Sequence, residues 1–234
     1  MTYWMYGWHA CNAALNNPLR KIEKILVDKR QDPKKLVLTR KIPVEAVDPK
    51  IIEQKVGKEA VHQGIAMCLH ELAPEDISLL EQDTPMLVVI LDQITDPHNM
   101  GAIWRSSAVF GAKGIITTER NSAPESGVLA KSASGALEVV PRIEVKNLAT
   151  SITELKELGF WVYGFSEHAK DTLQNFSFAK KTALIFGNEG DGMRSLTMKN
   201  CDQTLQLPTS AEFQTLNVSN AAAVALYEVF RQQH

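Results

Sequence analysis

The feature that most constrains this fold is a regular alternation of apolar runs and helical stretches that begins at Met86. The first run, Met86–Leu91 (MLVVIL), contains no polar residue, which is typical of a strand buried on both faces. Four more strands are predicted further along the chain, at Gly114–Thr117, Phe160–Tyr163, Ala183–Phe186 and Thr204–Leu207. Helical stretches lie between them, and the clearest is Asn147–Leu158, which Gly159 ends. The alternation predicts an α/β fold with a mainly parallel sheet covered by helices on both faces.

The C-terminal stretch Leu205–Arg231 combines a short strand, a polar loop and an alanine-rich helix predicted over Ala221–Arg231. The Asn and Ser residues just before this helix are types that cap helices. Such an arrangement places free backbone N–H groups and amide side chains around one concave spot. By itself, however, the stretch favours an ordinary C-terminal helix packed on a sheet.

The first 70 residues differ from the rest in the order of their predicted strands and helices and in net charge. Strands are predicted at Ile22–Val27, Val44–Val47 and Ile65–Leu69, and helices at Gly7–Asn16 and Pro49–Val56. This part holds 12 Lys and Arg against 7 Asp and Glu, a net charge of +5, whereas the remainder holds 13 against 20, a net charge of −7. A basic front unit on an acidic body is expected where only one domain contacts nucleic acid, although a solvated helical face explains the same charge.

The segment between these two parts is acidic and has Pro74 and Pro85 near its ends. We therefore predict a front domain over residues 1–70, a linker over 71–84 and a larger domain over 85–234. No run of about 18 apolar residues exists, so no membrane span is expected. The N-terminus lacks the pattern of a signal peptide, and three scattered cysteines fit a reducing cytoplasm.

Several common catalytic motifs are absent from the sequence: GxGxxG after the first strand, the P-loop, HExxH, GxSxG and paired CxxC. Nicotinamide dehydrogenases, P-loop kinases and zinc hydrolases are therefore not expected. What remains is a set of three polar loops, each just after a predicted strand: Asp92–Arg105, Gly187–Met193 and Pro208–Asn220. Ligands of parallel sheets bind beyond the carboxyl ends of the strands, where all three loops belong. Any one of these loops alone is more readily explained as structural.

Motifs in these loops resemble a known family. They are Asn99-x-Gly101-x-x-x-Arg105, the run Phe186–Met193 (FGNEGDGM), and Leu207-Pro208 followed by Leu216–Ser219 (LNVS). Together they are similar to the three motifs of the SpoU-class (TrmH-like) RNA 2′-O-ribose methyltransferases of the SPOUT superfamily. Lys131–Glu138 (KSASGALE) resembles a further segment of that family.

The front of the chain carries a second part of the resemblance. Tyr6-Gly7-x-His9-Ala10 and Val61–Gly64 (VHQG) look like the ribosomal-protein-like RNA-binding domain of one subgroup of the family. That subgroup methylates a guanosine in large-subunit (23S) rRNA. The resemblance therefore covers nearly the whole chain. It implies a small N-terminal α/β RNA-binding domain and a mostly parallel α/β catalytic domain with a C-terminal trefoil knot.

The resemblance also implies the site. The cofactor is S-adenosylmethionine, and the residues that the motifs assign to it are Gly187, Asn188, Leu207, Leu216 and Ser219. The residues assigned to catalysis are Asn99, Arg105, Glu189 and Asn217. No metal is required. One departure from the pattern is Ala211, which stands where family members usually carry glycine.

The implied reaction is methyl transfer to the ribose 2′-hydroxyl of an RNA nucleotide by a cytoplasmic homodimer. A free guanidinium stays protonated up to a pH of about 12, so an ordinary arginine is a poor base. We therefore expect Arg105 to bind a phosphate of the target and to stabilise the developing alkoxide, with Asn99, Glu189 and Asn217 orienting Arg105 and the ribose. Three alternatives stay open: a tRNA ribose methyltransferase of the same family, a methyltransferase of that family that confers antibiotic resistance, and a non-catalytic RNA-binding factor of ribosome assembly.

Overall fold

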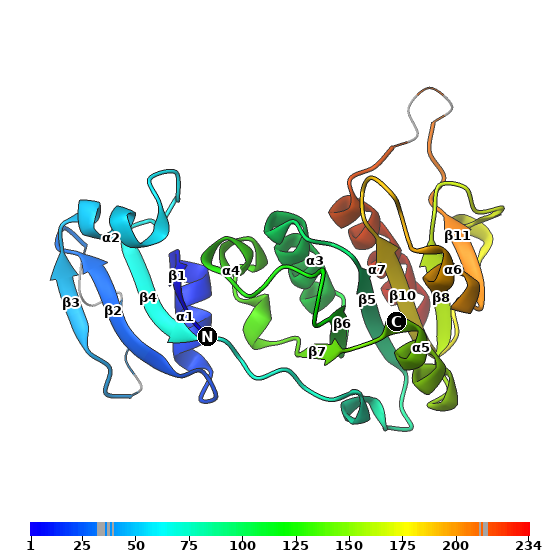
Figure 1. Ribbon diagram of the computed structural model, residues 1–234, viewed down its shortest axis with the longest axis horizontal. Coiled ribbons are helices and arrows are strands. Elements are labelled where there is room, and N and C mark those ends of the chain that lie inside the picture. Colours follow the sequence, from blue (N-terminus) through cyan, green and yellow to red (C-terminus); the bar gives the residue numbers. More distant parts are fainter. Residues whose placement is uncertain (32–35, 37, 39, 211, 213–214) are drawn as a thin grey trace.

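The computed structural model of the 234-residue chain describes every residue except 32–35, 37, 39, 211, 213 and 214. It contains two β-sheets, one on each side of an extended connecting segment that runs along the lower edge of Figure 1. None of the described helices combines the length and the apolar character that crossing a membrane requires.

The front sheet has four strands in the order β1-β4-β2-β3. These are β1 (Thr2–Tyr6), β4 (Ile65–His70), β2 (Ile22–Asp28) and β3 (Val44–Val47). Neighbours are antiparallel except β2 and β3, which are parallel. Helices α1 (Trp8–Asn16) and α2 (Pro49–Val56) pack against this sheet. The predicted front elements are confirmed, and α2 begins where Asp48 accepts a hydrogen bond from the Lys50 backbone N–H.

The second sheet has seven strands in the order β7-β6-β5-β10-β8-β11-β9, and every neighbouring pair is parallel. In chain order they are β5 (Met86–Asp92), β6 (Gly114–Thr118), β7 (Arg142–Val145), β8 (Trp161–Phe165), β9 (Asp171–Thr172), β10 (Lys181–Gly187) and β11 (Gln203–Gln206). The predicted parallel sheet is confirmed. Strands β7 and β9 were not predicted, because both are short edge strands with polar residues rather than apolar runs.

Five helices accompany this sheet: α3 (Pro97–Val109), α4 (Gly127–Ala133), α5 (Leu148–Glu157), α6 (Ser195–Asn200) and α7 (Val218–Gln233). Single-turn 3₁₀ helices lie at η2 (Ile77–Leu80), η3 (Ala136–Glu138) and η4 (Leu173–Asn175). Alternate residues of β5 belong to two different hydrophobic cores. Leu87, Val89 and Leu91 pack in the core that contains residues of α3 and α7, whereas Met86, Val88 and Ile90 pack in the core that contains residues of α5. The apolar character of the whole strand follows from this burial on both faces.

Helix α7 begins three residues earlier than the predicted start at Ala221. The side chain of Asn217 accepts a hydrogen bond from the backbone N–H of Ser219 at 2.9 Å and so caps the helix. The rule that Asn and Ser favour caps was right, but the capping residue is the first of the polar group and not the last. The trefoil knot stays a prediction.

The connecting segment packs on the second sheet's side of the molecule. Leu80 of η2 is fully buried in the core that contains α5, and Glu75 forms an isolated parallel bridge with Ile143. The division into residues 1–70, 71–84 and 85–234 stays a prediction.

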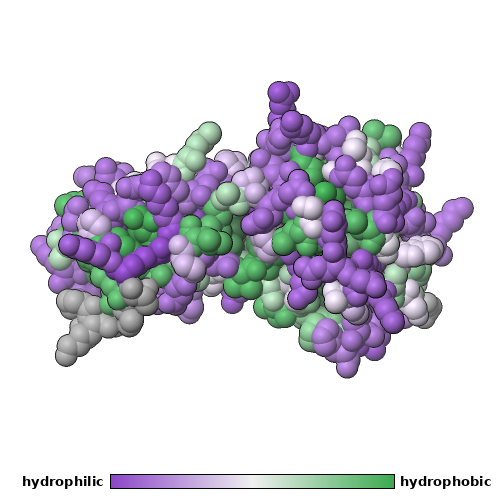
Figure 2. Space-filling model, turned by 90° about the horizontal axis from the view of Figure 1, so that it is seen from below, coloured by the Kyte–Doolittle hydropathy of each residue, from purple (hydrophilic) through white to green (hydrophobic). Residues whose placement is uncertain are grey.

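The two parts of the molecule share one hydrophobic core. Met5, Ala10 and Ala14 of the front part lie in the same buried cluster as Ala130 and Ala133 of α4. Figure 2 shows hydrophobic residues along the waist where the two parts meet. The shared core means that the front part is not an independent unit tethered by a free linker.

Glycines allow this close approach. A Cβ on Gly127 would lie 2.3 Å from the backbone oxygen of Trp4, and one on Gly135 would lie 2.8 Å from the Cβ of Ala13. Across the same interface, Lys131 donates to the side-chain oxygen of Gln63 at 2.9 Å. The two front motifs and the KSASGALE segment therefore contact one another.

A buried ionic network centred on Arg20 ties the interface together. Its guanidinium is fully buried and contacts Glu138 at 2.6 Å and Glu125 at 2.5 Å. The Tyr3 hydroxyl donates to Glu125 at 2.6 Å, and Asn17 donates to Glu138 at 2.7 Å. Burial, followed by the charge of Glu125, raises the pKa of Tyr3. Burial opposes the charge on Arg20, but the hydrogen bond to Glu138 and the charge of Glu125 still raise its pKa.

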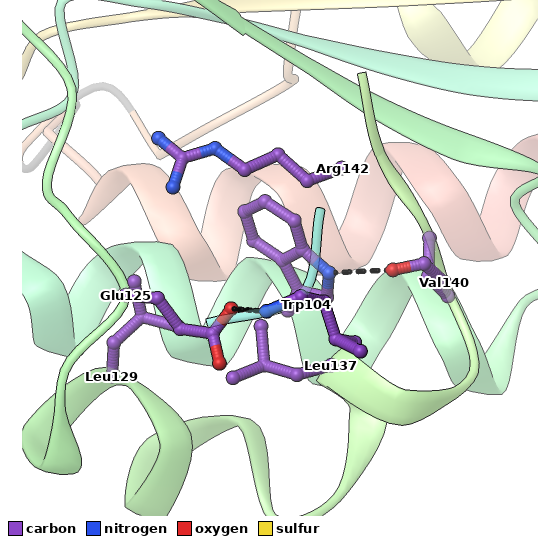
Figure 3. A pocket seen from close by; sticks show the side chains of 7 residues that line it. Trp104, Glu125, Leu129, Leu137, Val140 and Arg142 are labelled. Atoms are coloured by element: carbon purple, nitrogen blue, oxygen red, sulfur yellow. Dashed lines mark hydrogen bonds between the residues drawn. The ribbon is translucent and has the colours of Figure 1, made fainter. Parts of the chain in front are cut away.

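A cavity of about 20 Å³ lies beside this network (Figure 3). Its walls include Trp104, whose indole N–H donates to the backbone oxygen of Val140 at 3.0 Å, and Glu125, which accepts from the Leu72 N–H. A space of this size holds about one water molecule. It is too small for a substrate.

Candidate active site

The three polar loops lie together at the carboxyl edge of the second sheet. Strand β5 ends at Asp92, β10 ends at Gly187 and β11 ends at Gln206, and one loop follows each of them. Because all these strands are parallel, their carboxyl ends share one edge, as the sequence predicted.

A cavity of about 310 Å³ opens between the second and third loops. Four of the five predicted cofactor residues line it: Gly187, Asn188, Leu207 and Leu216. The fifth, Ser219, lies outside the lining, and its hydroxyl instead donates to the Asn217 side chain at 2.6 Å. Ala211 falls outside the described residues.

The Gly187–Met193 loop is closed on itself by its own backbone. The Asn188 N–H donates to the oxygen of Gly192 at 3.1 Å, and the Gly192 N–H returns a bond to the oxygen of Asn188 at 2.9 Å. A Cβ on Gly187 would lie 2.2 Å from the backbone of Gly192 and Met193. Gly192 has a φ of 66°, in the left-handed region that favours glycine. The closed loop is therefore a consequence of glycines at these two positions.

A polar cluster stands at one side of this cavity. The Glu189 carboxylate accepts from the Asn99 side chain at 3.0 Å, from the Asn217 side chain and from the Val218 backbone N–H at 3.4 Å. Asn217 also donates to the side-chain oxygen of Asn99 at 3.0 Å. Asp96 caps helix α3 by accepting from the backbone N–H groups of His98 and Asn99. One residue from each loop thus meets in a single hydrogen-bonded triangle.

Arg105, the fourth predicted catalytic residue, is not part of this triangle. It lies on α3 six residues after Asn99, which is a rotation of roughly 240° about the helix axis. Its side chain is exposed, and in the described part of the chain it has no hydrogen bond or ion pair with Asn99, Glu189 or Asn217. The structure therefore brings together three of the four predicted catalytic side chains.

Other lining residues were not predicted from the sequence. Phe165, at the end of β8, stacks on Phe186 with ring centroids 5.0 Å apart and planes 16° from parallel, and both rings line the cavity. Met193 and Met198 line it as well. Phe165 lies two residues beyond the predicted strand Phe160–Tyr163, on its carboxyl side, and this position was the signal that could have found it. In the described residues, no group of three or more His, Cys, Asp or Glu side chains is placed to hold a metal ion.

Comparison with known families accounts for almost the whole chain. The profile of the SpoU rRNA Methylase family matches residues 86–227. A second profile, RNA 2'-O ribose methyltransferase substrate binding, matches residues 4–74.

Similar proteins cover the chain from end to end. A 23S rRNA (guanosine-2'-O-)-methyltransferase RlmB from Pseudomonas aeruginosa is 35% identical over 100% of this chain and 98% of its own length. The protein of the same name from Pasteurella multocida is 37% identical over 98% of each chain. Among solved structures, the SpoU methyltransferase AviRb from Streptomyces viridochromogenes in complex with AdoMet superposes with a TM-score of 0.85 at 23% identity. It covers 99% of this chain and 90% of that one.

Proposed function

Because the chain belongs to the SpoU rRNA methylase family, we propose that it transfers a methyl group from S-adenosylmethionine to the ribose 2′-hydroxyl of a guanosine in 23S rRNA. The observation that carries this proposal is the match to 23S rRNA guanosine methyltransferases over both the front part and the second part of the chain. A tRNA target and a non-catalytic role are not favoured, since these relatives are rRNA enzymes and all four predicted catalytic residues are present.

Ribose methylation in RNA from a strain that lacks this gene tests the proposal. One 2′-O-methylguanosine in 23S rRNA should disappear and should return when the gene is restored. An unchanged 23S rRNA together with a lost tRNA methylation would favour the tRNA alternative.

The cavity at the Gly187–Met193 loop fits the cofactor. Its volume of about 310 Å³ lies within the range of small-molecule sites, roughly 300–1,000 Å³. Phe165, Leu207 and Leu216 supply apolar walls, and the loop backbone supplies N–H and C=O groups for polar edges. When bound, S-adenosylmethionine supplies an electrophilic sulfonium methyl group and leaves as a neutral thioether. Alignment of the acceptor by the chain's residues therefore accounts for much of the rate.

Gly187→Ala tests this assignment. The new methyl group would clash with backbone atoms of Gly192 and Met193, which cannot move as a side chain would. Overpacking of this kind costs roughly 1–3 kcal/mol, so we expect the Kd for S-adenosylmethionine to rise by roughly 5- to 150-fold. The matched control is Gly190→Ala in the same loop, where a Cβ meets nothing within 4 Å. Titration calorimetry measures both, and equal affinities for the two variants would contradict the assignment.

We propose that the active protein is a homodimer and that Arg105 of one copy serves the Asn99–Glu189–Asn217 triangle of the other. The support is twofold. Arg105 leaves α3 on a different face from Asn99, and that outer region of α3 and α7 is apolar. Val109 is 66% exposed on α3, while Val224 and Tyr227 are 47% and 52% exposed on α7. Phe110 joins the two helices by contacting the ring of Tyr227. Covering this face with a second copy would bury the exposed apolar side chains.

Mixing two inactive variants tests this dimer. Arg105→Ala and Glu189→Ala should each keep no more than about 1% of the parent activity when alone. Refolded mixtures should regain roughly a quarter of the parent activity. Half of the dimers would be mixed, and each would hold one intact site of two. A site formed within one chain predicts no recovery. Sedimentation of the parent as a monomer at micromolar concentration would also contradict the dimer.

We further propose that residues 1–70 select the RNA while the second part binds the cofactor. The net charge of +5 in the front part and the match of residues 4–74 to a substrate-binding family support this division. Because the two parts share a core, the division is best tested by charge reversal on the front surface of the full chain. Weaker binding of rRNA with unchanged cofactor affinity is the expected result.

A further inference from the structure

A second hollow lies at the same edge of the sheet as the proposed cofactor cavity. Its volume is about 360 Å³, and it is lined by Thr118, Glu119, Arg120, Asn121, Lys146 and Arg194. Thr118 ends β6, Lys146 follows β7, and Arg194 directly follows Met193 of the cofactor cavity. We call these six residues the basic hollow. Three of them are cations and one is an acid, although residues 71–234 as a whole carry a net charge of −7.

Arg194 is held in place by a buried carboxylate. Its Nε contacts Asp92 Oδ1 at 2.7 Å, and its backbone N–H donates to Asp92 Oδ2 at 3.0 Å. Asp92 is fully buried, whereas the Arg194 side chain is 44% exposed. The two terminal nitrogens of Arg194 have no hydrogen bond to the residues that the structure describes. A guanidinium fixed in this way keeps a fork of donors suited to a phosphate group.

Arg120 and Lys146 are exposed cations on adjoining loops. The first of these loops is anchored: the Glu119 N–H donates to the Val145 oxygen at 3.0 Å, and the Thr118 hydroxyl donates to the Arg120 backbone oxygen. Among the described residues, neither Arg120 nor Lys146 has an ion-pair partner. Three cations and the acid Glu119 line the hollow, and Asp92 pairs with Arg194 behind it. A net excess of one positive charge remains, which an anion would neutralise.

We propose that the basic hollow binds phosphate groups of the RNA backbone next to the target nucleotide. This inference rests on the proposed function. It adds the path that the bound RNA follows across the surface of the protein. The hollow and the cofactor cavity meet at consecutive residues, Met193 and Arg194, so an RNA strand with its ribose at the cavity can place a neighbouring phosphate in the hollow. Arg194 and Arg120 would contact phosphate oxygens, and Lys146 would add a point charge.

The salt dependence of RNA binding tests the proposal in the full-length protein. Each phosphate contact adds roughly 0.7–0.9 to the slope of log Kd against log salt concentration. We expect Arg120→Ala/Lys146→Ala to lower that slope for a 23S rRNA transcript by roughly 1.4–1.8. Between 50 and 200 mM KCl the variant should therefore lose roughly 7- to 12-fold less affinity than the parent. Arg194 is left unchanged because its removal would leave the buried carboxylate of Asp92 without its ion-pair partner.

The matched control is Lys113→Ala/Lys180→Ala, which removes the same charge. These two lysines directly precede β6 and β10 and so lie at the amino ends of the strands, opposite the carboxyl ends where the basic hollow lies. Its slope should equal that of the parent. A slope for the Arg120/Lys146 variant equal to the parent's, or an equal fall in the control, would overturn the proposal. Calorimetry with S-adenosylmethionine separates this failure from failure of the proposed function: both double variants should bind the cofactor as the parent does.

Discussion

Replacing Arg20 with alanine should lower the free energy of unfolding by about 3–5 kcal/mol, the cost of breaking a buried ion pair by removing one partner. Arg20 is fully buried, and the side chains of Glu125 and Glu138 are only 8% and 4% exposed. Without the guanidinium, two buried carboxylates in the interface between the two parts of the molecule would have no cation beside them and would repel each other. For a chain of this size, each 1 kcal/mol shifts Tm by about 2–4 °C, so the expected loss is roughly 6–20 °C.

The control for this variant is Lys21→Ala, at the next residue along the chain. Lys21 also forms an ion pair, with Glu23 at 3.4 Å, but both side chains are exposed, by 69% and 46%. Exposed pairs contribute about 0–1 kcal/mol, so Tm should change little. Calorimetric melting of both variants measures the difference. Equal shifts for Arg20→Ala and Lys21→Ala would show that the buried network does not hold the interface.

Arg105→Ala should lower the methyl-transfer rate by about 10²–10³-fold, which corresponds to about 2.7–4 kcal/mol of transition-state stabilisation. The physical reason is the loss of the cation that we expect to bind the target's phosphate and to stabilise charge on the ribose oxygen. Arg105→Lys keeps the charge but loses the planar fork, so it should retain measurable activity. Cofactor affinity should change little in both variants, because Arg105 does not line the cavity.

The pH dependence of the lysine variant separates two roles for Arg105. A lysine has an ordinary pKa near about 10.4, so it could act as a base at high pH where arginine cannot. If Arg105 stabilises charge, the rate of Arg105→Lys should follow the parent's pH profile near neutral pH. It should then fall below the parent's rate as the lysine loses its charge around its pKa of about 10.4. Single-turnover rates from neutral to alkaline pH measure this. A rise for the lysine variant along an ionisation that the parent lacks would indicate a base role instead.

The core of the second sheet was predictable from the sequence because its signals are local. Met86–Leu91 contains no polar residue, and a strand between two helical layers needs apolar side chains on both faces. The start of α5 was also predictable, since Asn147 accepts hydrogen bonds from Ala149 and Thr150 as a capping residue should. The position of the three loops then followed from parallel strand direction alone.

The interface between the two parts could not be predicted in the same way. Arg20 stands beside Lys21 in a segment that reads as a basic surface, and its carboxylate partners Glu125 and Glu138 lie more than 100 residues away. Nothing local distinguishes this arginine from an exposed one. The roles of Gly127 and Gly135 depend on which backbone approaches them, which is a property of the assembled fold. Strand β9, with two residues, is defined only by its pairing with β11.

The candidate active site was predictable from the sequence only in part. The resemblance grouped Asn99, Glu189 and Asn217, and the structure brings them within hydrogen-bond distance. The separation of Arg105 from them is implicit in the spacing of six residues, because helical rotation places positions 99 and 105 on different faces. Ser219 was assigned to the cofactor, but in the structure its hydroxyl and backbone N–H both bond to the capping side chain of Asn217.

Methyl transfer by the purified full-length protein is the most direct test of the proposed ribose methylation of 23S rRNA. The protein is incubated with S-adenosylmethionine carrying a labelled methyl group and with 23S rRNA from a strain that lacks the gene. The RNA is then hydrolysed in alkali, which cannot cleave next to a 2′-O-methylated ribose. We expect label in one alkali-resistant dinucleotide that begins with 2′-O-methylguanosine. Label on a base, or no label in 23S rRNA while S-adenosylmethionine is bound, would contradict it.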